Sequence, residues 1–203
     1  QLEHYRQINR QLALGLATPE EARRLAKEGK AIVWIDSGLH ATEVAPVQLA
    51  RFVQRCIASH PRADTVRVDW SGTQENVWVQ ADELLLEHVV NNLLSNACAW
   101  SIRNGKPARI RVSLACARSE RMASISVADN GPGVAEADRE QIFNAFFSTQ
   151  EGGMGMGLAI CRSIVEAHHG RIEVGSDPEL GGARFTVWLP LVPAAPAEKG
   201  EAP

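Results

Sequence analysis

The stretch from residue 82 to residue 133 constrains the fold most, because it joins one long helix to two strands and a glycine-rich turn. Asp82 to Ile102 is predicted to be helical, since apolar residues recur there at helical spacing. Ala108 to Ala115 and Met122 to Ala128 are predicted strands, and the second leads directly into the turn DNGPG. This succession predicts a two-layer α/β sandwich, with helices packed on one face of a mixed sheet.

The remaining segments extend this α/β pattern. They comprise helices at 47–57 and 158–168, a hairpin of strands at 65–70 and 76–80, and closing strands at 171–176 and 183–189. The first 43 residues predict a short extension with two helices, at 1–14 and 19–28, and a strand at 31–35. We therefore expect an N-terminal segment at 1–43, one α/β domain at 44–192, and a disordered tail at 193–203.

Composition is that of an ordinary globular protein. Of 203 residues, 45% are hydrophobic and 22% are charged, and the formal net charge is −3. A chain without excess positive charge is not expected to bind nucleic acid or an anionic membrane. The four cysteines are widely spaced, which indicates reduced thiols and a cytoplasmic setting. No signal peptide or membrane-spanning run is predicted, and the start at Gln1 indicates part of a longer protein.

Two asparagines in the long helix are candidate ligands. Asn92 and Asn96 lie four residues apart, so they are expected on one helix face, while the neighbouring leucines and valines point into the core. An amide carbonyl is a hard oxygen ligand, which magnesium accepts together with water and phosphate oxygens. The alternative is that both are solvated helix residues.

The turn DNGPG follows a strand and carries a carboxylate. Asp129, at the end of that strand, can accept a hydrogen bond from an exocyclic amine such as that of adenine. Gly131 and Gly133 would let the backbone approach a base closely. The alternative is an ordinary turn between two elements.

A glycine run stands directly before the last predicted helix. Gly153, Gly155 and Gly157 alternate there, so that bare amides and the helix N-terminus could hold phosphate oxygens. The run matches neither a Walker A motif nor a dinucleotide-binding fingerprint, and a flexible loop is the alternative. Upstream, the three phenylalanines of QIFNAFFST are spaced so that a helical turn would bury two of them.

Four segments, in this order, resemble the conserved boxes of the ATP-binding catalytic domain of sensor histidine kinases: NNLLSNA, DNGPG, FNAFF and GGMGMGLAI. They are similar to the N box, the first glycine box, the F box and the second glycine box. The resemblance covers about 44–192 and extends to the wider family of gyrase, heat-shock chaperones and MutL repair proteins. It implies the Bergerat-type ATP-binding fold of that family.

The resemblance implies ATP and Mg²⁺ as cofactors and assigns roles to single residues. Asn96 would coordinate magnesium at the ATP phosphates, with Asn92 beside it, and these two are the catalytic candidates. Asp129 would bind the adenine amine. The other nucleotide contacts would come from Gly131, Gly133, Gly153, Gly155, Gly157 and Leu158. Relatives with a similarly short lid often carry a lysine where this chain has Gln150, so one phosphate contact is in question.

The implied activity is transfer of the ATP γ-phosphate to a histidine by a bacterial two-component sensor kinase. Gyrase and the chaperones would have a glutamate general base where Asn92 stands, which favours the kinase branch. The acceptor pattern, a histidine followed by an acidic residue and then proline, does not occur in this chain. The expected partners are therefore a phosphoacceptor domain outside the chain, a response regulator, and a second copy of the parent protein. The alternative is a non-catalytic nucleotide-binding regulatory module.

The N-terminal segment suggests different chemistry. GKAIVWIDSGLHATEVAP resembles the zinc motif of metallocarboxypeptidases, in which His40 and Glu43 would be two ligands. Peptide hydrolysis also needs a third ligand and a glutamate base, which in that family lie far downstream. Here the downstream chain carries the nucleotide-binding boxes, so we expect a truncated peptidase fragment or a surface loop without a complete zinc site.

Overall fold

The computed structural model describes residues 44–62, 66–73, 75–103, 107–147 and 155–193. Several predictions lie outside these residues. They concern the N-terminal segment 1–43 with His40 and Glu43, the loop residues Gln150 and Gly153, and the tail beyond residue 193.

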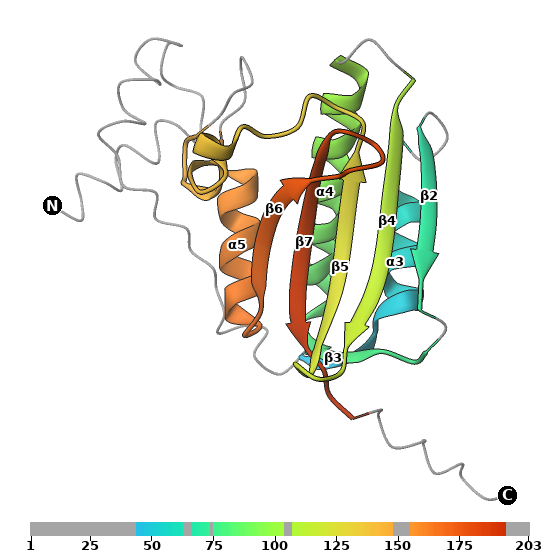
Figure 1. Cartoon of the computed structure of the whole chain (residues 1–203). Helices are drawn as coiled ribbons and strands as arrows, with labels where there is room; N and C mark the ends of the chain where they lie inside the picture. The colour runs from blue at the N-terminus through green and yellow to red at the C-terminus, as the bar shows by residue number, and fades with distance from the viewer. Residues whose placement is uncertain (1–43, 63–65, 74, 104–106, 148–154, 194–203) are drawn as a thin grey trace, which may run out of the picture. The chain divides into compact units, whose positions relative to one another are not determined.

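A five-stranded mixed sheet forms one layer of the domain (Figure 1). Its strands are β2 (Arg67–Gly72), β4 (Arg109–Ala117), β5 (Met122–Asp129), β6 (Arg171–Ser176) and β7 (Ala183–Pro190). The spatial order is β2-β4-β5-β7-β6, with β2 parallel to β4 and all other neighbours antiparallel. The last four of these strands match the predicted ones closely, and the mixed sheet is confirmed.

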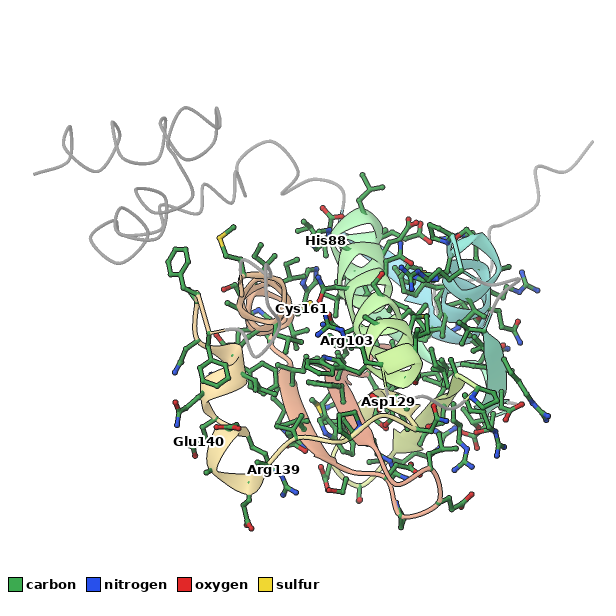
Figure 2. The ribbon with its side chains drawn as sticks, turned by 90° about the horizontal axis from the view of Figure 1, so that it is seen from above. His88, Arg103, Asp129, Arg139, Glu140 and Cys161 are labelled. Carbon is green, nitrogen blue, oxygen red and sulfur yellow. The ribbon has the colours of Figure 1, made fainter. Side chains whose placement is uncertain are left out.

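Three helices form the second layer. They are α3 (Leu49–Ser59), α4 (Glu83–Arg103) and α5 (Gly157–Ala167). All three lie on the same side of the sheet, as Figure 2 shows from above, which confirms the two-layer α/β sandwich. The core between the layers is built from buried apolar side chains of both, including Phe52, Val90, Leu93, Leu94, Val112, Ile125, Val165 and Val187.

The predicted hairpin over 65–70 and 76–80 is wrong. β2 pairs with β4 in the large sheet, whereas β3 (Trp78–Ala81) pairs antiparallel with β1 (Ala45–Gln48) in a separate two-stranded sheet. Beyond β2 the chain stays beside β4, because the amide of Thr73 donates to the carbonyl of Leu114 at 3.1 Å. Alternating valines predict a strand, but they do not determine which neighbouring strand offers a free edge.

The start of the first predicted helix also needs correction. The sequence pattern predicts a helix from residue 47, but Val47 lies in β1 and pairs with Val79, and α3 begins at Leu49. Gln48 caps this helix, since its side-chain oxygen accepts a hydrogen bond from the amide of Arg51 at 2.7 Å. Glutamine is not among the preferred capping residues, so the sequence gives little signal for this boundary.

Helices α4 and α5 lie side by side and run in opposite directions. The amide of Asp82, just before α4, donates to Nε2 of His168, just after α5, at 2.9 Å. At the opposite end of α5, where the helix begins, an added Cβ at Gly157 would lie only 2.6 Å from Nδ2 of Asn92. The N-terminus of α5 therefore abuts the middle of α4, where the two asparagines lie.

Candidate functional site

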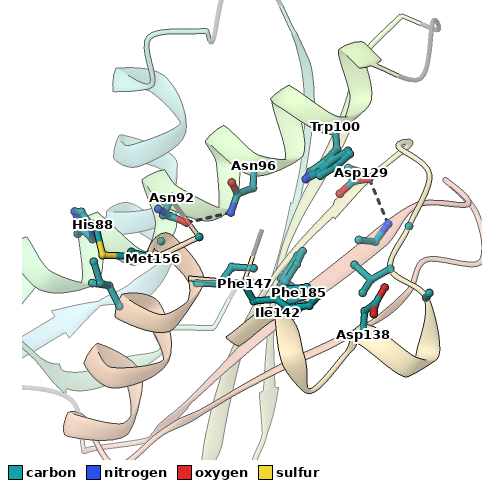
Figure 3. Close-up of a pocket in the computed structure, with 18 residues that line it drawn as sticks. His88, Asn92, Asn96, Trp100, Asp129, Asp138, Ile142, Phe147, Met156 and Phe185 are labelled. Atoms are coloured by element: carbon teal, nitrogen blue, oxygen red, sulfur yellow. Dashed lines mark hydrogen bonds between the residues drawn. The ribbon is translucent and has the colours of Figure 1, made fainter. Parts of the chain in front are cut away.

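A cavity of about 650 Å³ lies between α4, the start of α5 and the ends of β5 and β7 (Figure 3). Seven of the residues predicted to bind a nucleotide line it: Asn92, Asn96, Asp129, Gly133, Gly155, Gly157 and Leu158. A cavity of this size is typical of a small-molecule site. The structure thus brings together, in one place, segments that lie far apart in the sequence.

The two asparagines point into this cavity from one face of α4. Nδ2 of Asn96 donates to Oδ1 of Asn92 at 3.1 Å, and both side chains are half-buried. Their apolar neighbours Leu93, Leu94 and Ala97 are at most 3% exposed, which confirms that they face the core. The core contacts of these apolar residues fix the rotation of the helix about its axis, and the two amides therefore face the cavity.

Asp129 closes the opposite end of the cavity from the end of β5. Its Oδ1 accepts two backbone hydrogen bonds, from Gly131 at 2.8 Å and from Ala183 at 3.3 Å. Burial raises the pKa of this carboxyl above its ordinary value, while the two hydrogen bonds act in the opposite direction. Oδ2 has no hydrogen bond to any residue that the structure describes, so it remains available as an acceptor.

The glycines beside Asp129 hold its backbone close. A Cβ on Gly182 would lie 2.3 Å from the carbonyl oxygen of Asp129, and one on Gly131 would lie 2.9 Å from its Oδ1. Gly133 lines the cavity with φ +78°, a backbone conformation that favours glycine. Gly131 itself does not line the cavity, so its part here is to allow close packing against Trp100 and Asp129.

At the other end, the second glycine box leads into α5. Gly155 has φ +65°, and a Cβ there would lie 2.5 Å from the carbonyl oxygen of Phe147. Met156, the N-cap residue of α5, gives the first turn no side-chain hydrogen bond. The first amides of the helix therefore remain available to an anion in the cavity. Gly157 and Leu158 belong to this first turn and both line the cavity.

Two of the three phenylalanines anchor the segment before this loop, as predicted. Phe143 is buried and packs edge-on against Phe185 of β7, with ring centroids 6.4 Å apart. Phe147 is half-buried and lines the cavity. Phe146 is 41% exposed and has φ 68°, where its amide donates to the carbonyl of Gly155 at 3.0 Å.

Sequence reasoning missed three polar residues that line the cavity: His88, Trp100 and Asp138. His88 and Trp100 lie four residues before Asn92 and four after Asn96, so helical periodicity alone could have found them. Asp138 ends the short 3₁₀ helix Glu136–Asp138, which no pattern predicted. It adds a second carboxylate at the end of the cavity where Asp129 lies (Figure 3).

The described residues show neither a metal cluster nor a membrane-spanning helix. Within them, no three His, Cys, Asp or Glu side chains converge in a way that could hold a metal ion. The helices of the same residues include none with the length and apolar character to cross a membrane. All four cysteines are free thiols, and burial raises the pKa of Cys161 to about 12, so this thiol stays protonated.

Comparison with known proteins identifies the domain around this cavity. Residues 81–193 match the family model described as histidine kinase-, DNA gyrase B-, and HSP90-like ATPase. The C4-dicarboxylate transport sensor protein DctS of Rhodobacter capsulatus is 45% identical over 117 residues, and the sensor histidine kinase ZraS of Escherichia coli O157:H7 is 41% identical over 113. Each match covers 56% of this chain but only 17% and 23% of the relative, so this chain spans less than a quarter of either protein.

Solved structures agree with this match. The mycobacterial sensor histidine kinase MprB has a TM-score of 0.62 at 28% identity, covering 74% of this chain and 99% of that one. Full-length ShkA in complex with AMPPNP has a TM-score of 0.64 at 29% identity, covering 75% of this chain and 32% of that one. Fold, cavity and family match coincide over the same residues, and the chain therefore belongs to the histidine kinase-, DNA gyrase B- and HSP90-like ATPase family.

Proposed function

We propose that this chain is the ATP-binding catalytic domain of a two-component sensor histidine kinase. In this role it binds ATP with Mg²⁺ and donates the γ-phosphate to a histidine on a dimerisation domain outside the chain. The observation that carries the proposal is the convergence of Asn92, Asn96, Asp129 and the start of α5 on one cavity. Relatives named as sensor histidine kinases, ZraS and MprB, support the kinase branch of the family.

The Asp129 end of the cavity suits an adenine ring. Oδ1 is already engaged by two backbone amides, so the carboxylate is fixed and its Oδ2 is left to accept from an exocyclic amine. Trp100, Ile142 and Phe185 provide apolar surface against which a base can pack. An amine acceptor in an apolar slot selects adenine over guanine, which presents a carbonyl at the same position.

The Asn92 and Asn96 end suits the phosphates and a magnesium ion. The hydrogen bond between the two amides leaves Oδ1 of Asn96 without a partner among the described residues, and such a hard oxygen fits Mg²⁺. When bound, this ion neutralises charge on the phosphate oxygens. Asn96 would hold it, with Asn92 orienting the Asn96 amide, while the free amides at the start of α5 bind the phosphate chain.

Among the residues that the structure describes, no carboxylate that could act as a general base lines the cavity at the end where the two asparagines lie. Asn92 is an amide, which cannot accept a proton from water at neutral pH. The two carboxylates that line the cavity, Asp129 and Asp138, lie at its adenine end. We expect catalysis here to consist of positioning and charge neutralisation, with the terminal phosphate passing to an acceptor histidine. This role requires two partners, the acceptor domain and a response regulator that takes the phosphate from it.

Isothermal titration of the 203-residue chain with ATP, with and without Mg²⁺, tests the binding step. We expect magnesium-dependent binding, and a chain that binds no ATP in either condition would contradict the proposal. Addition of an acceptor domain together with γ-labelled ATP then tests transfer. Label on the histidine supports the kinase, whereas tight binding without transfer to any acceptor would favour a regulatory nucleotide-binding module. For substitutions of the cavity asparagines, Asn91→Ala is the matched control, since Asn91 lies next to Asn92 on α4 but does not line the cavity.

A further inference from the structure

His88 extends the row of polar side chains on α4 by one turn. It lies four residues before Asn92, as Asn92 lies four before Asn96, so the three share one face of the helix. All three line the cavity. Figure 3 shows His88 beside Met156, next to the start of α5 and at the opposite end from Asp129. None of the sequence boxes includes this residue.

The order of the lining residues along α4 indicates how a nucleotide would be oriented in the cavity. Trp100 lies at the Asp129 end, Asn96 and Asn92 follow, and His88 comes last. The three turns from Trp100 to His88 rise about 18 Å along the helix axis. A nucleotide with its base at Asp129 and its phosphates at the asparagines therefore directs its terminal phosphate toward His88.

Positively charged side chains are common partners of phosphate groups. No lysine or arginine lines the cavity among the described residues. The sequence from Asn144 to Gly157, which connects the phenylalanines to α5, contains neither residue type and includes Glu151. At that end, His88 is the described lining residue with a basic side chain. Its imidazole can donate a hydrogen bond from a ring nitrogen.

The imidazole is free to serve this purpose. His88 is exposed at the mouth of the cavity, and it forms no hydrogen bond or ion pair with any part of the chain that the structure describes. His168 contrasts with it, since both of its ring nitrogens are engaged, one with the amide of Asp82 at 2.9 Å and one with the carbonyl of Ile164 at 2.7 Å. His168 holds α4 and α5 together, whereas His88 has no such structural contact.

We propose that His88 binds the terminal phosphate of ATP through its imidazole, so that the site distinguishes ATP from ADP. The inference rests on the proposed function, because it takes the direction of the nucleotide from it. His88 adds a phosphate contact on the face of α4 that lines the cavity, where no lysine or arginine of the described residues is present.

Titration of the 203-residue chain with ADP and with the non-hydrolysable ATP analogue AMPPNP, both with Mg²⁺, tests this proposal. For His88→Ala we expect affinity for AMPPNP to fall about tenfold, as for the loss of a hydrogen bond to a charged group, with affinity for ADP unchanged within about twofold. His88→Gln keeps a nitrogen donor and should retain part of the difference. Leu84→Ala is the matched control, because Leu84 lies one turn further along the same face, is 65% exposed and does not line the cavity.

The remaining outcomes separate the two proposals. Wild-type chain that binds both nucleotides, with His88→Ala binding AMPPNP as tightly as wild type, would overturn the role of His88 and leave the proposed function standing. An equal loss of ADP and AMPPNP affinity would also overturn it. ADP lacks the terminal phosphate of ATP, so the loss of a contact to that phosphate cannot weaken ADP binding. Wild-type chain that binds neither nucleotide would contradict the proposed function and the role of His88 together.

Discussion

Asn96 donates a hydrogen bond from Nδ2 to Oδ1 of Asn92 over 3.1 Å, one turn apart on α4. This contact uses the acceptor of one amide and a donor of the other. It therefore leaves Oδ1 of Asn96 and Nδ2 of Asn92 available to the cavity, one as a ligand for a cation and one as a donor to an anion. The same sequence pattern thus produces two different groups, which matches the needs of a metal and a phosphate side by side.

Replacement of Asn96 by alanine should remove the magnesium dependence of ATP binding. We expect ATP affinity in Mg²⁺ to fall roughly tenfold or more, to the value measured without the metal. Thermal unfolding should change little, since the side chain is half-buried and faces the cavity. Asn91→Ala, which removes a buried amide oxygen without a partner, should bind ATP–Mg²⁺ as wild type does. Unchanged binding by the Asn96 variant would rule out Asn96 as the metal ligand.

Replacement of Asp129 by asparagine should relax the preference for adenine. An amide in this place keeps one oxygen for the amides of Gly131 and Ala183 but turns its NH₂ toward the base, where an amine donor would meet it. Affinity for ATP should fall about fivefold to 100-fold, since a buried donor is left unpaired. GTP affinity should rise relative to ATP, because guanine offers an acceptor there. Parallel titrations with both nucleotides measure the ratio, and an unchanged ratio would exclude Asp129 from base recognition.

Much of the site was predictable because its residues are tied to local patterns. The four-residue spacing of Asn92 and Asn96 determines a shared helix face, and Asp129 stands at the end of a clearly alternating strand. What brings Asp129 to the cavity, however, is the pairing of β5 with β7, which places Ala183 and Gly182 beside it. That pairing is between segments far apart in the chain.

The errors have the same origin. The valines of β2 and β3 predict strands correctly, yet these strands join different sheets, because β4 and β1 offer the edges that they pair with. His88 and Asp138 were not predictable for a related reason, since neither belongs to a recognisable motif and only the cavity groups them with the asparagines. Local sequence thus indicates which elements form, and tertiary packing decides which partners they meet.

Gly182 should not tolerate even a methyl group. A Cβ there would lie 2.3 Å from the carbonyl oxygen of Asp129 and 2.7 Å from the amide nitrogen of Gly131. Gly182→Ala should lower the free energy of unfolding by about 1–3 kcal/mol and weaken ATP binding, since the displaced backbone carries Asp129. Gly175→Ala is the matched control, because a Cβ there meets nothing within 4 Å. Urea unfolding of both variants measures the difference, and equal stabilities would contradict the close approach at Gly182.

Asp177 should make stability depend on pH in the acidic range. Burial acts to raise the pKa of its carboxyl, but hydrogen bonds from Leu180, Glu179 and Arg184 outweigh it, and the pKa lies below the ordinary 3.8. A lowered pKa in the folded state means that the charged form stabilises the fold above pH 3.8 and that this contribution is lost as the pH falls through the lower, folded-state pKa. The ion pair with Arg184 holds the turn that leads into β7.

Asp177→Asn mimics the protonated side chain and should therefore remove this dependence. At pH 7 the variant should be less stable than wild type by about 1–3 kcal/mol, as for the loss of a charge-assisted hydrogen bond. The difference should shrink as the pH falls below about 4, because Asp177 of the unfolded wild-type chain then binds a proton before Asp177 of the folded protein does. Asp69→Asn, which removes an exposed carboxylate beside Arg67, serves as the control and should change stability less. Urea unfolding of the three proteins between pH 7 and pH 3 measures the effect, and a wild-type advantage that stays constant to pH 3 would show that the ionised carboxylate of Asp177 does not stabilise the turn.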